Sequence, residues 1–380
     1  MKITARTLSD QICEVEIDGP IFKKIAPHKG DILDLPWIAP GLIDIQINGF
    51  GGVDFNRPLE SDEAWRHATQ QLYIHGCTGF LATLITNREE GYRKLLTDLT
   101  ARIRRDPRNC LGFHMEGPWL NLDPGYRGAH RAEWMQKPSV RLLEEWSALA
   151  GDLLKLITLA PEVDLPASLE VIRSGVKKKI VFFLGHSAAM GESLGQVMAA
   201  GAVGWTHLGN AVPATVPKFE NVIFHALAQS GLMASLIPDG LHLPPHAFRA
   251  LAWMLNQANP SRLLLTTDAM AAAGTDKPGA YTLGDVQVEV GTDGAARLPG
   301  SGRLAGSTLT PLQGVARAEQ MASIYLEEAW KAFSIRPASL LNFKHGLAEG
   351  NSADFVLLAP EKTPYVLATY HRGKCVYEAP

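Results

Sequence analysis

This chain of 380 residues lacks several features that would place it in a broad class of proteins. No apolar stretch approaches the roughly 20 residues that cross a bilayer, so we expect no membrane partner. The net charge is only −3, which gives no sign of a nucleic-acid-binding surface. The N-terminal segment lacks the apolar core of a secretion signal. No internal repeat or low-complexity tract is visible.

Cysteine is also scarce. Cys13, Cys77, Cys110 and Cys375 are scattered along the chain without a paired spacing. This distribution is typical of reduced thiols rather than of a disulfide framework. Together with the missing secretion signal, it predicts a cytoplasmic protein.

The middle of the chain alternates strand-like apolar runs with helix-length amphipathic segments, such as residues 61–76 and 139–152. Eight such alternations predict an α/β protein with a (β/α)₈ barrel of the TIM type. After the last run, residues 281–300 resemble a hairpin with its turn at 292–294, and residues 307–333 are helical in pattern. The predicted strands are residues 42–48, 79–84, 110–116, 153–159, 179–186, 202–207, 232–237 and 262–268.

The two ends of the chain differ from the middle, because both are short and β-like. Residues 1–39 and 346–380 contain alternating segments such as "QICEVEID" and "YVLATYHRGKCVYE". We expect them to pair into one small domain, with the barrel formed by residues 40–345.

Polar or titratable residues recur where the predicted strands end, which is the edge of a (β/α)₈ barrel where active sites lie. Glu116, His186 and His207 end strands three, five and six. One carboxylate and two imidazoles suit a catalytic divalent metal. The alternative is that these side chains bond to one another without a metal. The other strand-end residues are Gln46, Asn48, Glu162, Asp239, His242 and Asp268.

Asp268 ends the eighth predicted strand, in "LLLTTDAM". A buried carboxylate needs a partner, and beside an attacking water it could accept a proton and pass it to a leaving amine. The alternative is an N-cap for the segment that follows.

Gln46 and Asn48 share one face of the first strand, in "PGLIDIQINGFGG". Many metal hydrolases carry His-x-His there, whereas carboxamides are poor ligands for transition metals. We expect a single metal ion per chain, with Gln46 and Asn48 hydrogen-bonded to the groups around it. The plainer alternative is that they only satisfy backbone groups.

The chain resembles the N-acetylglucosamine-6-phosphate deacetylases of the amidohydrolase superfamily, from about residue 38 to residue 355. The similarity lies in "PGLIDIQINGFGG", "HMEGPWLN", "GAH", "TLAPE", "GHS", "THLGNAVP", "DGLHL", "TTDAM" and "LAGSTLT", which occur in the family's order. The resemblance implies a barrel with a small β-sandwich built from both termini. It also implies hydrolysis of the N-acetyl amide of an amino sugar to the amine and acetate.

The resemblance further implies roles for individual residues. Glu116, His186 and His207 would hold one divalent metal, zinc in the first place, with iron or another ion as the alternative. Asp268 would activate water and protonate the amine, and His130 would contact the amide carbonyl. His242 would contact the sugar, and Asn210 and Ala211 would lie at its phosphate end. Members of the family are commonly homodimers that complete the site from the neighbour.

The segment after His207 departs from the family pattern, because Gly209 replaces a tyrosine and no arginine follows before Arg249. Three explanations remain open. Lys218 could bind the phosphate, although a lysine offers only a point charge where arginine offers a bidentate fork. Arg127 or the partner subunit's Lys218 could serve instead. Finally, the substrate could be an unphosphorylated or different N-acetylated sugar.

Two competing functions are hydrolysis of another amide within the superfamily and metal-free binding on a barrel scaffold. The segment "HMEGPWLN" argues against the first. The presence of Glu116, His186, His207 and Asp268 together argues against the second.

Overall fold

The computed structural model describes residues 1–30, 34–258 and 262–380. Its centre is a sheet of eight parallel strands in the order β14-β13-β12-β11-β10-β9-β8-β5, which confirms the predicted barrel. The strands are β5 (Leu42–Ile47), β8 (Cys77–Ile85), β9 (Cys110–Glu116), β10 (Leu154–Leu159), β11 (Val181–Leu184), β12 (Ala202–Trp205), β13 (Met233–Leu236) and β14 (Leu263–Leu265).

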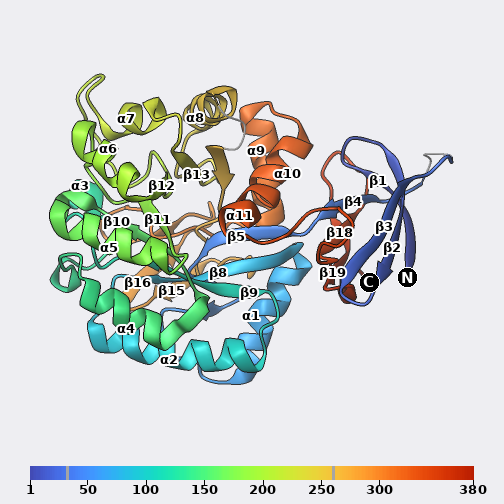
Figure 1. The fold of residues 1–380 in the computed structure, drawn as a ribbon, viewed down its shortest axis with the longest axis horizontal. Coiled ribbons are helices and arrows are strands. Elements are labelled where there is room, and N and C mark those ends of the chain that lie inside the picture. The colour runs from blue at the N-terminus through green and yellow to red at the C-terminus, as the bar shows by residue number, and fades with distance from the viewer. Residues whose placement is uncertain (31–33, 259–261) are drawn as a thin grey trace.

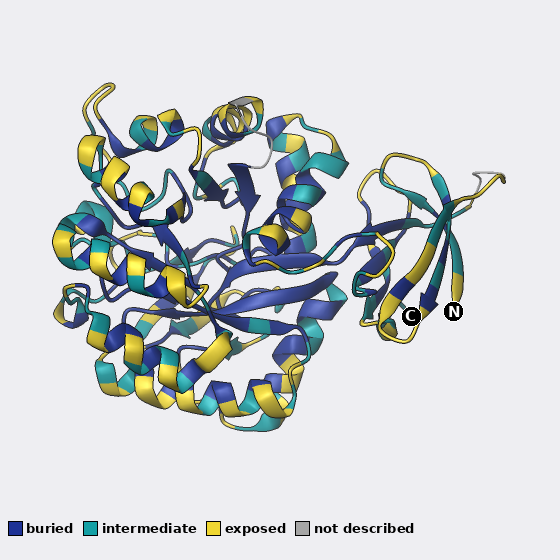
Figure 2. Ribbon diagram, in the orientation of Figure 1, coloured by how far each residue is buried: buried dark blue, intermediate teal, exposed yellow. Residues whose placement is uncertain are grey.

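Helices surround this sheet, so the strands are buried on both faces (Figures 1 and 2). Every residue of β5 and β8 is buried, which explains why these strands are rich in apolar residues. The helices are α1 (Asp62–Ile74), α2 (Glu89–Arg105), α3 (Pro124–Arg127), α4 (Val140–Ala150), α5 (Leu165–Lys177), α6 (Gly191–Ala200), α7 (Val222–Ala228), α8 (Pro245–Ala258), α9 (Pro311–Ala322), α10 (Leu326–Ala332) and α11 (Ile335–Leu340), with 3₁₀ turns at Ala132–Trp134, Gly151–Leu153 and Pro161–Val163.

The barrel closes between its first and last strands through a short seam. A single parallel bridge pairs Ile47 with Ala269, beyond the end of β14. Beside it, the buried carboxylate of Asp44 accepts hydrogen bonds from the hydroxyls of Thr266 and Thr267, at 2.5 and 2.6 Å, and from the Thr267 backbone N–H. The side chain of Asp44, in β5, therefore joins the first strand of the sheet to the segment that follows the last strand, β14.

The segment predicted as one long helical stretch, residues 307–333, is broken. A capping box of Thr310 and Gln313 starts α9, with Pro311 in its first turn. α9 ends at Ser323, which takes a left-handed conformation with φ of 55°, and α10 begins after Tyr325. The left-handed residue ends the first helix because it turns the chain out of the helical path.

The predicted hairpin over residues 281–300 is a three-stranded antiparallel sheet of β15 (Gly279–Leu283), β16 (Val286–Val290) and β17 (Ala296–Arg297). The predicted turn at 292–294 lies between β16 and β17. The sequence reading missed a second turn, at Gly284 with φ of 58°, which separates β15 from β16. A two-stranded ribbon, β6 (Gly49–Phe50) and β7 (Val53–Asp54), follows β5.

The two chain ends form a separate, mostly antiparallel sheet at one side of the barrel, where both termini lie (Figure 1). Phe22, in an edge strand of this sheet, packs against Phe355 from a strand that is not its neighbour in the sheet. The rings of Phe355 and Tyr370 are stacked, with their centroids 4.4 Å apart. The sheet therefore folds over on itself around a small core, as in a β-sandwich. Its strands are β1 (Lys2–Thr7), β2 (Ile12–Asp18), β3 (Ile21–Pro27), β4 (Trp37–Pro40), β18 (Phe355–Leu358), β19 (Val366–His371) and β20 (Lys374–Glu378).

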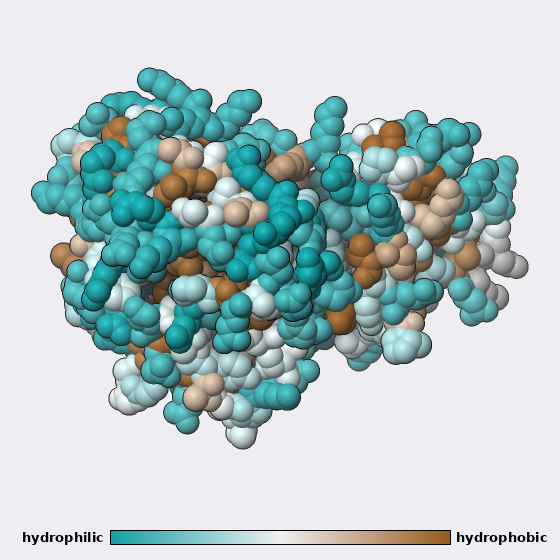
Figure 3. All heavy atoms as spheres, turned by 90° about the horizontal axis from the view of Figure 1, so that it is seen from below, coloured by the Kyte–Doolittle hydropathy of each residue, from teal (hydrophilic) through white to brown (hydrophobic). Residues whose placement is uncertain are grey.

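The predicted boundaries of this domain, 1–39 and 346–380, remain a prediction, and residues 31–33 within them lie outside the described part of the chain. No described helix is long and apolar enough to cross a membrane. The face drawn in Figure 3 is largely hydrophilic, with hydrophobic side chains in small separate areas.

Candidate functional site

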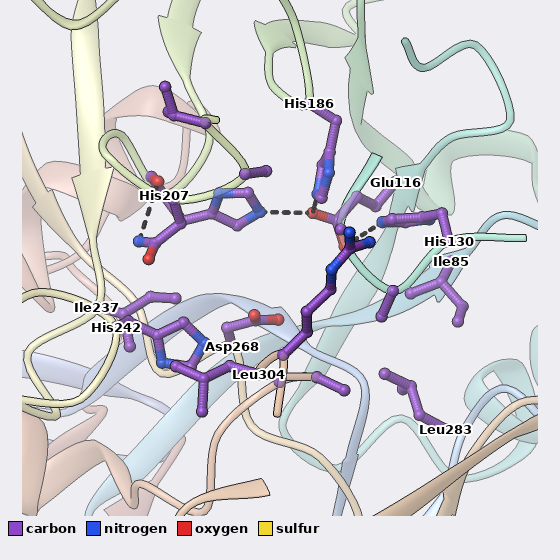
Figure 4. A pocket seen from close by; sticks show the side chains of 18 of the residues that line it. Ile85, Glu116, His130, His186, His207, Ile237, His242, Asp268, Leu283 and Leu304 are labelled. Carbon is purple, nitrogen blue, oxygen red and sulfur yellow. Dashed lines mark hydrogen bonds and ion pairs between the residues drawn. The ribbon is translucent and has the colours of Figure 1, made fainter. Parts of the chain in front are cut away.

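A cavity of about 370 Å³ opens at the carboxyl ends of the barrel strands. Glu116, His130, His186, His207 and Asp268 line it, and all five are buried. Figure 4 shows the first four side chains directed toward one another, with Asp268 and His242 across the cavity from them. The structure therefore brings together residues that the sequence spreads over more than 150 positions.

Three of these residues share an unusual backbone conformation. His186, His207 and Asp268 have φ of 51°, 35° and 52°, in the left-handed region that non-glycine residues rarely occupy. Each follows its strand by two or three residues, so β11, β12 and β14 are shorter than the sequence predicts. Such strain costs on the order of 1–3 kcal/mol per residue and concentrates at functional sites.

Glu116 is the centre of the cluster. Its Oε1 lies 2.9 Å from His207 Nε2 and 3.3 Å from His186 Nε2, and it accepts a 2.9 Å hydrogen bond from the Gln46 carboxamide. Burial opposes the charge of Glu116, but the two histidines more than offset it and hold its pKa well below the usual range. Within the described residues, its ion-pair partners are histidines only.

His186 is oriented by the backbone. Its Nδ1 lies 2.9 Å from the carbonyl oxygen of Tyr126, which can only accept, so Nδ1 carries the proton. In the neutral ring, Nε2 then directs a lone pair at the carboxylate of Glu116. Such a pair needs a cation between its two atoms, either a proton on Nε2 or a metal ion, so it fits a divalent metal when the ring is neutral. Gly128 allows the approach, because a Cβ there would lie 3.1 Å from the His186 ring.

His130 also lies in the cluster, but it carries its proton on Nε2, whereas His186 carries its proton on Nδ1. One ring nitrogen each of His130 and His186 and a carboxylate oxygen of Glu116 lie within 4.8 Å of one another. However, His130 Nδ1 accepts a hydrogen bond from the backbone N–H of Thr86 at 3.4 Å, so the proton resides on Nε2. Burial, followed by the nearby His186, lowers the pKa of His130 to about 3, so the ring stays neutral. His130 Nε2–H is a donor that faces the cavity, rather than a free ligand atom.

Asp268 accepts a 2.7 Å hydrogen bond at Oδ1 from the carboxamide of Asn48. Burial and the negative charge of Glu116 raise its pKa to about 7. A carboxyl group with such a pKa can both accept and return a proton near neutral pH. Asn48 and Gln46, the carboxamide pair of the first strand, thus contact two different carboxylates of the site.

His242 and Asp268 both line the cavity. The Nδ1 of His242 lies 2.6 Å from the Oδ2 of Asp239. Burial opposes ionisation of Asp239, but its bonds to His242 and to two backbone N–H groups outweigh this and lower its pKa. The His242 ring therefore presents its Nε2 to the cavity as an acceptor when neutral.

Of the remaining predicted residues, some line the cavity and others do not. Asn210 and Ala211 line the cavity. Lys218 does not, because it is exposed and its ammonium lies 5.3 Å from the centre of the Phe219 ring. Arg127 does not line it either. Glu162, at the end of the fourth strand, instead accepts hydrogen bonds from Asn121 and Ser187 and joins neighbouring loops.

Sequence reasoning missed the residues that orient the histidines and two that line the cavity. Tyr126 acts through its backbone carbonyl, so its side-chain type carries no signal. Thr86 acts through its backbone N–H and through its hydroxyl, which lies 2.9 Å from His130 Nδ1. Arg303 and Leu304 line the cavity from the loop after β17. The adjacent "LAGSTLT" segment was the available signal for this loop.

Three comparisons bear on this geometry. The model of the amidohydrolase family matches residues 37–376. An N-acetylglucosamine-6-phosphate deacetylase from Rattus norvegicus is 34% identical over 363 residues, covering 90% of this chain and 84% of the relative. One from Bacillus subtilis is 32% identical over 353 residues, with the same coverage.

A solved structure of the Mycobacterium smegmatis N-acetyl-D-glucosamine-6-phosphate deacetylase, in complex with N-acetyl-D-glucosamine-6-phosphate, superposes with a TM-score of 0.89. The two chains are 27% identical, and each is covered to 99%. The similarity therefore extends over the barrel and the terminal sheet alike.

Proposed function

The chain belongs to the amidohydrolase family, among the N-acetylglucosamine-6-phosphate deacetylases, and on this premise we propose that it is a metal-dependent hydrolase that removes the N-acetyl group from an amino sugar. The products are the free amine and acetate. The observation that carries the proposal is the convergence of Glu116, His186 and His207 on one side of a cavity, with Asp268 on the other.

Glu116, His186 and His207 are the proposed ligands of one divalent metal per chain. The outward Nε2 lone pair of His186 and the buried, acceptor-only Glu116 support this set. Zinc suits one carboxylate and two imidazoles, and iron or another divalent ion is the alternative. Gln46 and Asn48, which donate hydrogen bonds to Glu116 and Asp268, support a site for one metal rather than two.

When bound, the metal would polarise the amide carbonyl and lower the pKa of an attacking water to about 7. Asp268 takes the proton of that water and delivers it to the leaving amine. His130 donates from Nε2 to the oxygen that becomes negative as the carbonyl is attacked. Asn48 keeps the Asp268 carboxyl group oriented through both proton transfers.

The sugar occupies the rest of the cavity. We assign His242 to the sugar ring, and Asn210 and Ala211 to its distal end, because all three line the cavity. Lys218 lies outside the lining of this chain's cavity, so only the partner subunit's Lys218 could reach the phosphate.

A cytoplasmic homodimer is the proposed form of the protein. Three of its four cysteines are buried and all are free, in keeping with a reducing compartment. Phe219 and Phe224 are 69% and 45% exposed. Their ring centroids lie 6.0 Å apart, and Phe219 directly follows Lys218 in the chain. Exposed aromatic side chains of this kind favour a contact with a second copy.

Acetate release from purified protein tests the proposal. The wild-type chain, loaded with zinc or iron, should release acetate from N-acetylglucosamine-6-phosphate or a related N-acetylhexosamine, and a chelator should abolish the activity. Restoration by added divalent metal is the control. A preference for N-acetyl amino acids in acetate release, or ring opening of cyclic amides in a separate assay, would overturn the substrate class, and activity that resists complete metal removal would overturn the mechanism.

A further inference from the structure

The cavity described above has one strongly basic side chain at its mouth. Of the described residues that line it, only Arg303 is a lysine or arginine. The five residues of the reacting end are each at most 9% exposed, whereas Arg303 falls in the exposed class. Arg303 therefore belongs to the solvent-exposed part of the cavity lining.

The backbone beneath Arg303 is fixed by a tight hairpin. The N–H of Leu298 donates to the carbonyl of Arg303 at 2.8 Å, and the N–H of Ala305 donates to Ala296 at 3.0 Å. Gly300 and Gly302, with φ of 75° and 69°, make the turn possible. The guanidinium is thus carried on an ordered hairpin.

This guanidinium has no carboxylate partner. Across the parts of the chain that the structure describes, the Arg303 side chain makes no ion pair and no hydrogen bond, and only its backbone N–H bonds to a side chain, the Ser301 hydroxyl. Arg297, on the same hairpin, differs, because it pairs with Asp293 at 2.7 Å. An arginine that lines a cavity and has no internal partner is free to bind an anion from solution.

A phosphate monoester is an anion that suits arginine, because two parallel N–H groups fit two phosphate oxygens. The first segment expected to supply such a residue, after His207, has no arginine before Arg249, and its Lys218 lies outside the lining of this chain's cavity. We propose that Arg303 binds the phosphate group of the substrate and makes the enzyme selective for amino-sugar phosphates over free amino sugars. This inference rests on the proposed deacetylation.

Steady-state kinetics on the metal-loaded enzyme test the assignment. Arg303→Gln should lower kcat/KM for N-acetylglucosamine-6-phosphate by roughly 10–100-fold, mainly through KM, since this is the usual effect of losing a charged hydrogen-bond donor. It should leave kcat/KM for free N-acetylglucosamine unchanged. Arg303→Lys should recover part of the loss. Arg297→Gln, which removes the same charge from the same hairpin outside the cavity, is the matched control.

Binding of glucose-6-phosphate, measured by calorimetry on the same proteins, provides a readout independent of turnover. Arg303→Gln should weaken it about as much as it raises KM, and thermal melting should show that the variant is folded. Equal effects on both sugars, no effect on either, or a selective loss in Lys218→Gln instead would overturn the assignment. If the wild type deacetylates neither sugar, the proposed function fails, whereas the calorimetry still decides whether Arg303 binds phosphate.

Discussion

Asn48 and Asp268 lie 220 residues apart in the chain, yet a 2.7 Å hydrogen bond joins the carboxamide of one to the carboxylate of the other. Asn48 follows the first barrel strand and Asp268 follows the last, so the bond crosses the seam of the barrel. It occupies Oδ1 of Asp268, and no hydrogen bond within the described residues occupies Oδ2. One oxygen is held in place while the other faces the cavity.

Replacing the proton carrier should abolish most of the activity without removing the metal. Asp268→Asn keeps an oxygen for Asn48 to bond but cannot accept a proton. We expect kcat to fall by about 10²–10⁴-fold, the usual contribution of a general acid–base group. Metal content, measured by mass spectrometry, should stay at the wild-type level. A loss of less than tenfold would contradict the assigned role.

The pH dependence should follow the carboxyl group of Asp268. Because the base must be ionised, kcat/KM should fall as the pH drops below the pKa of Asp268. The hydrogen bond from Asn48 lowers that pKa, so its removal in Asn48→Ala should raise the pKa and move the acidic limb to higher pH. If the acidic limb of the kcat/KM profile does not move in this variant, a group other than Asp268 controls it. Asn109→Ala, which removes a buried carboxamide bonded to the backbone carbonyls of Thr69 and Cys77 outside the cavity lining, serves as the control.

The two histidines that flank Glu116 should respond differently to the same substitution. His186→Gln should lose most of the bound metal, because it removes a ligand atom. His130→Gln should retain the metal and lower kcat by roughly 10²–10³-fold, because it removes a donor to the developing oxyanion. Metal content and kcat measured on both variants distinguish the roles. Equal metal loss in both would make His130 a ligand.

Asp44 should make the stability of the fold depend on pH. Burial raises the pKa of its carboxyl group to about 6, from an unfolded value near 4. The folded state therefore binds this proton more tightly, and its stability falls as the pH rises from about 4 to about 6. The loss should be on the order of 3 kcal/mol and complete above that range.

Asp44→Asn has no proton to lose, so the wild type should lose stability relative to this variant across the same pH range. Urea unfolding at pH 4.5 and pH 7.5 measures the difference. A difference in unfolding free energy between the two proteins that is the same at both pH values would contradict the prediction. The variant should be less stable at both, because it replaces an acceptor with a donor toward Thr267 N–H or the threonine hydroxyls.

The barrel could be predicted from the sequence because its strands are buried on both faces and read as apolar runs, as in β8. Their ends could not, since the left-handed turns at His186, His207 and Asp268 depend on contacts from other strands. Glu116 and the two histidines were found because they end the predicted strands. Arg303 was missed because it comes from a hairpin inserted after the last strand, where no periodic pattern points to the cavity.

The seam between β5 and β14 has a consequence for the order in which the molecule is built. Glu116 and His186 emerge from the ribosome long before Asp268, and the barrel cannot close until its eighth strand is synthesised. Pairing over such a separation is slow, and the open intermediate exposes strand edges that can aggregate. Because Asn48 and Asp268 sit at the closing contact, the proton carrier reaches its working position only when the fold itself is complete. A chain stalled or cut before residue 268 would hold the histidines and Glu116 but no catalyst.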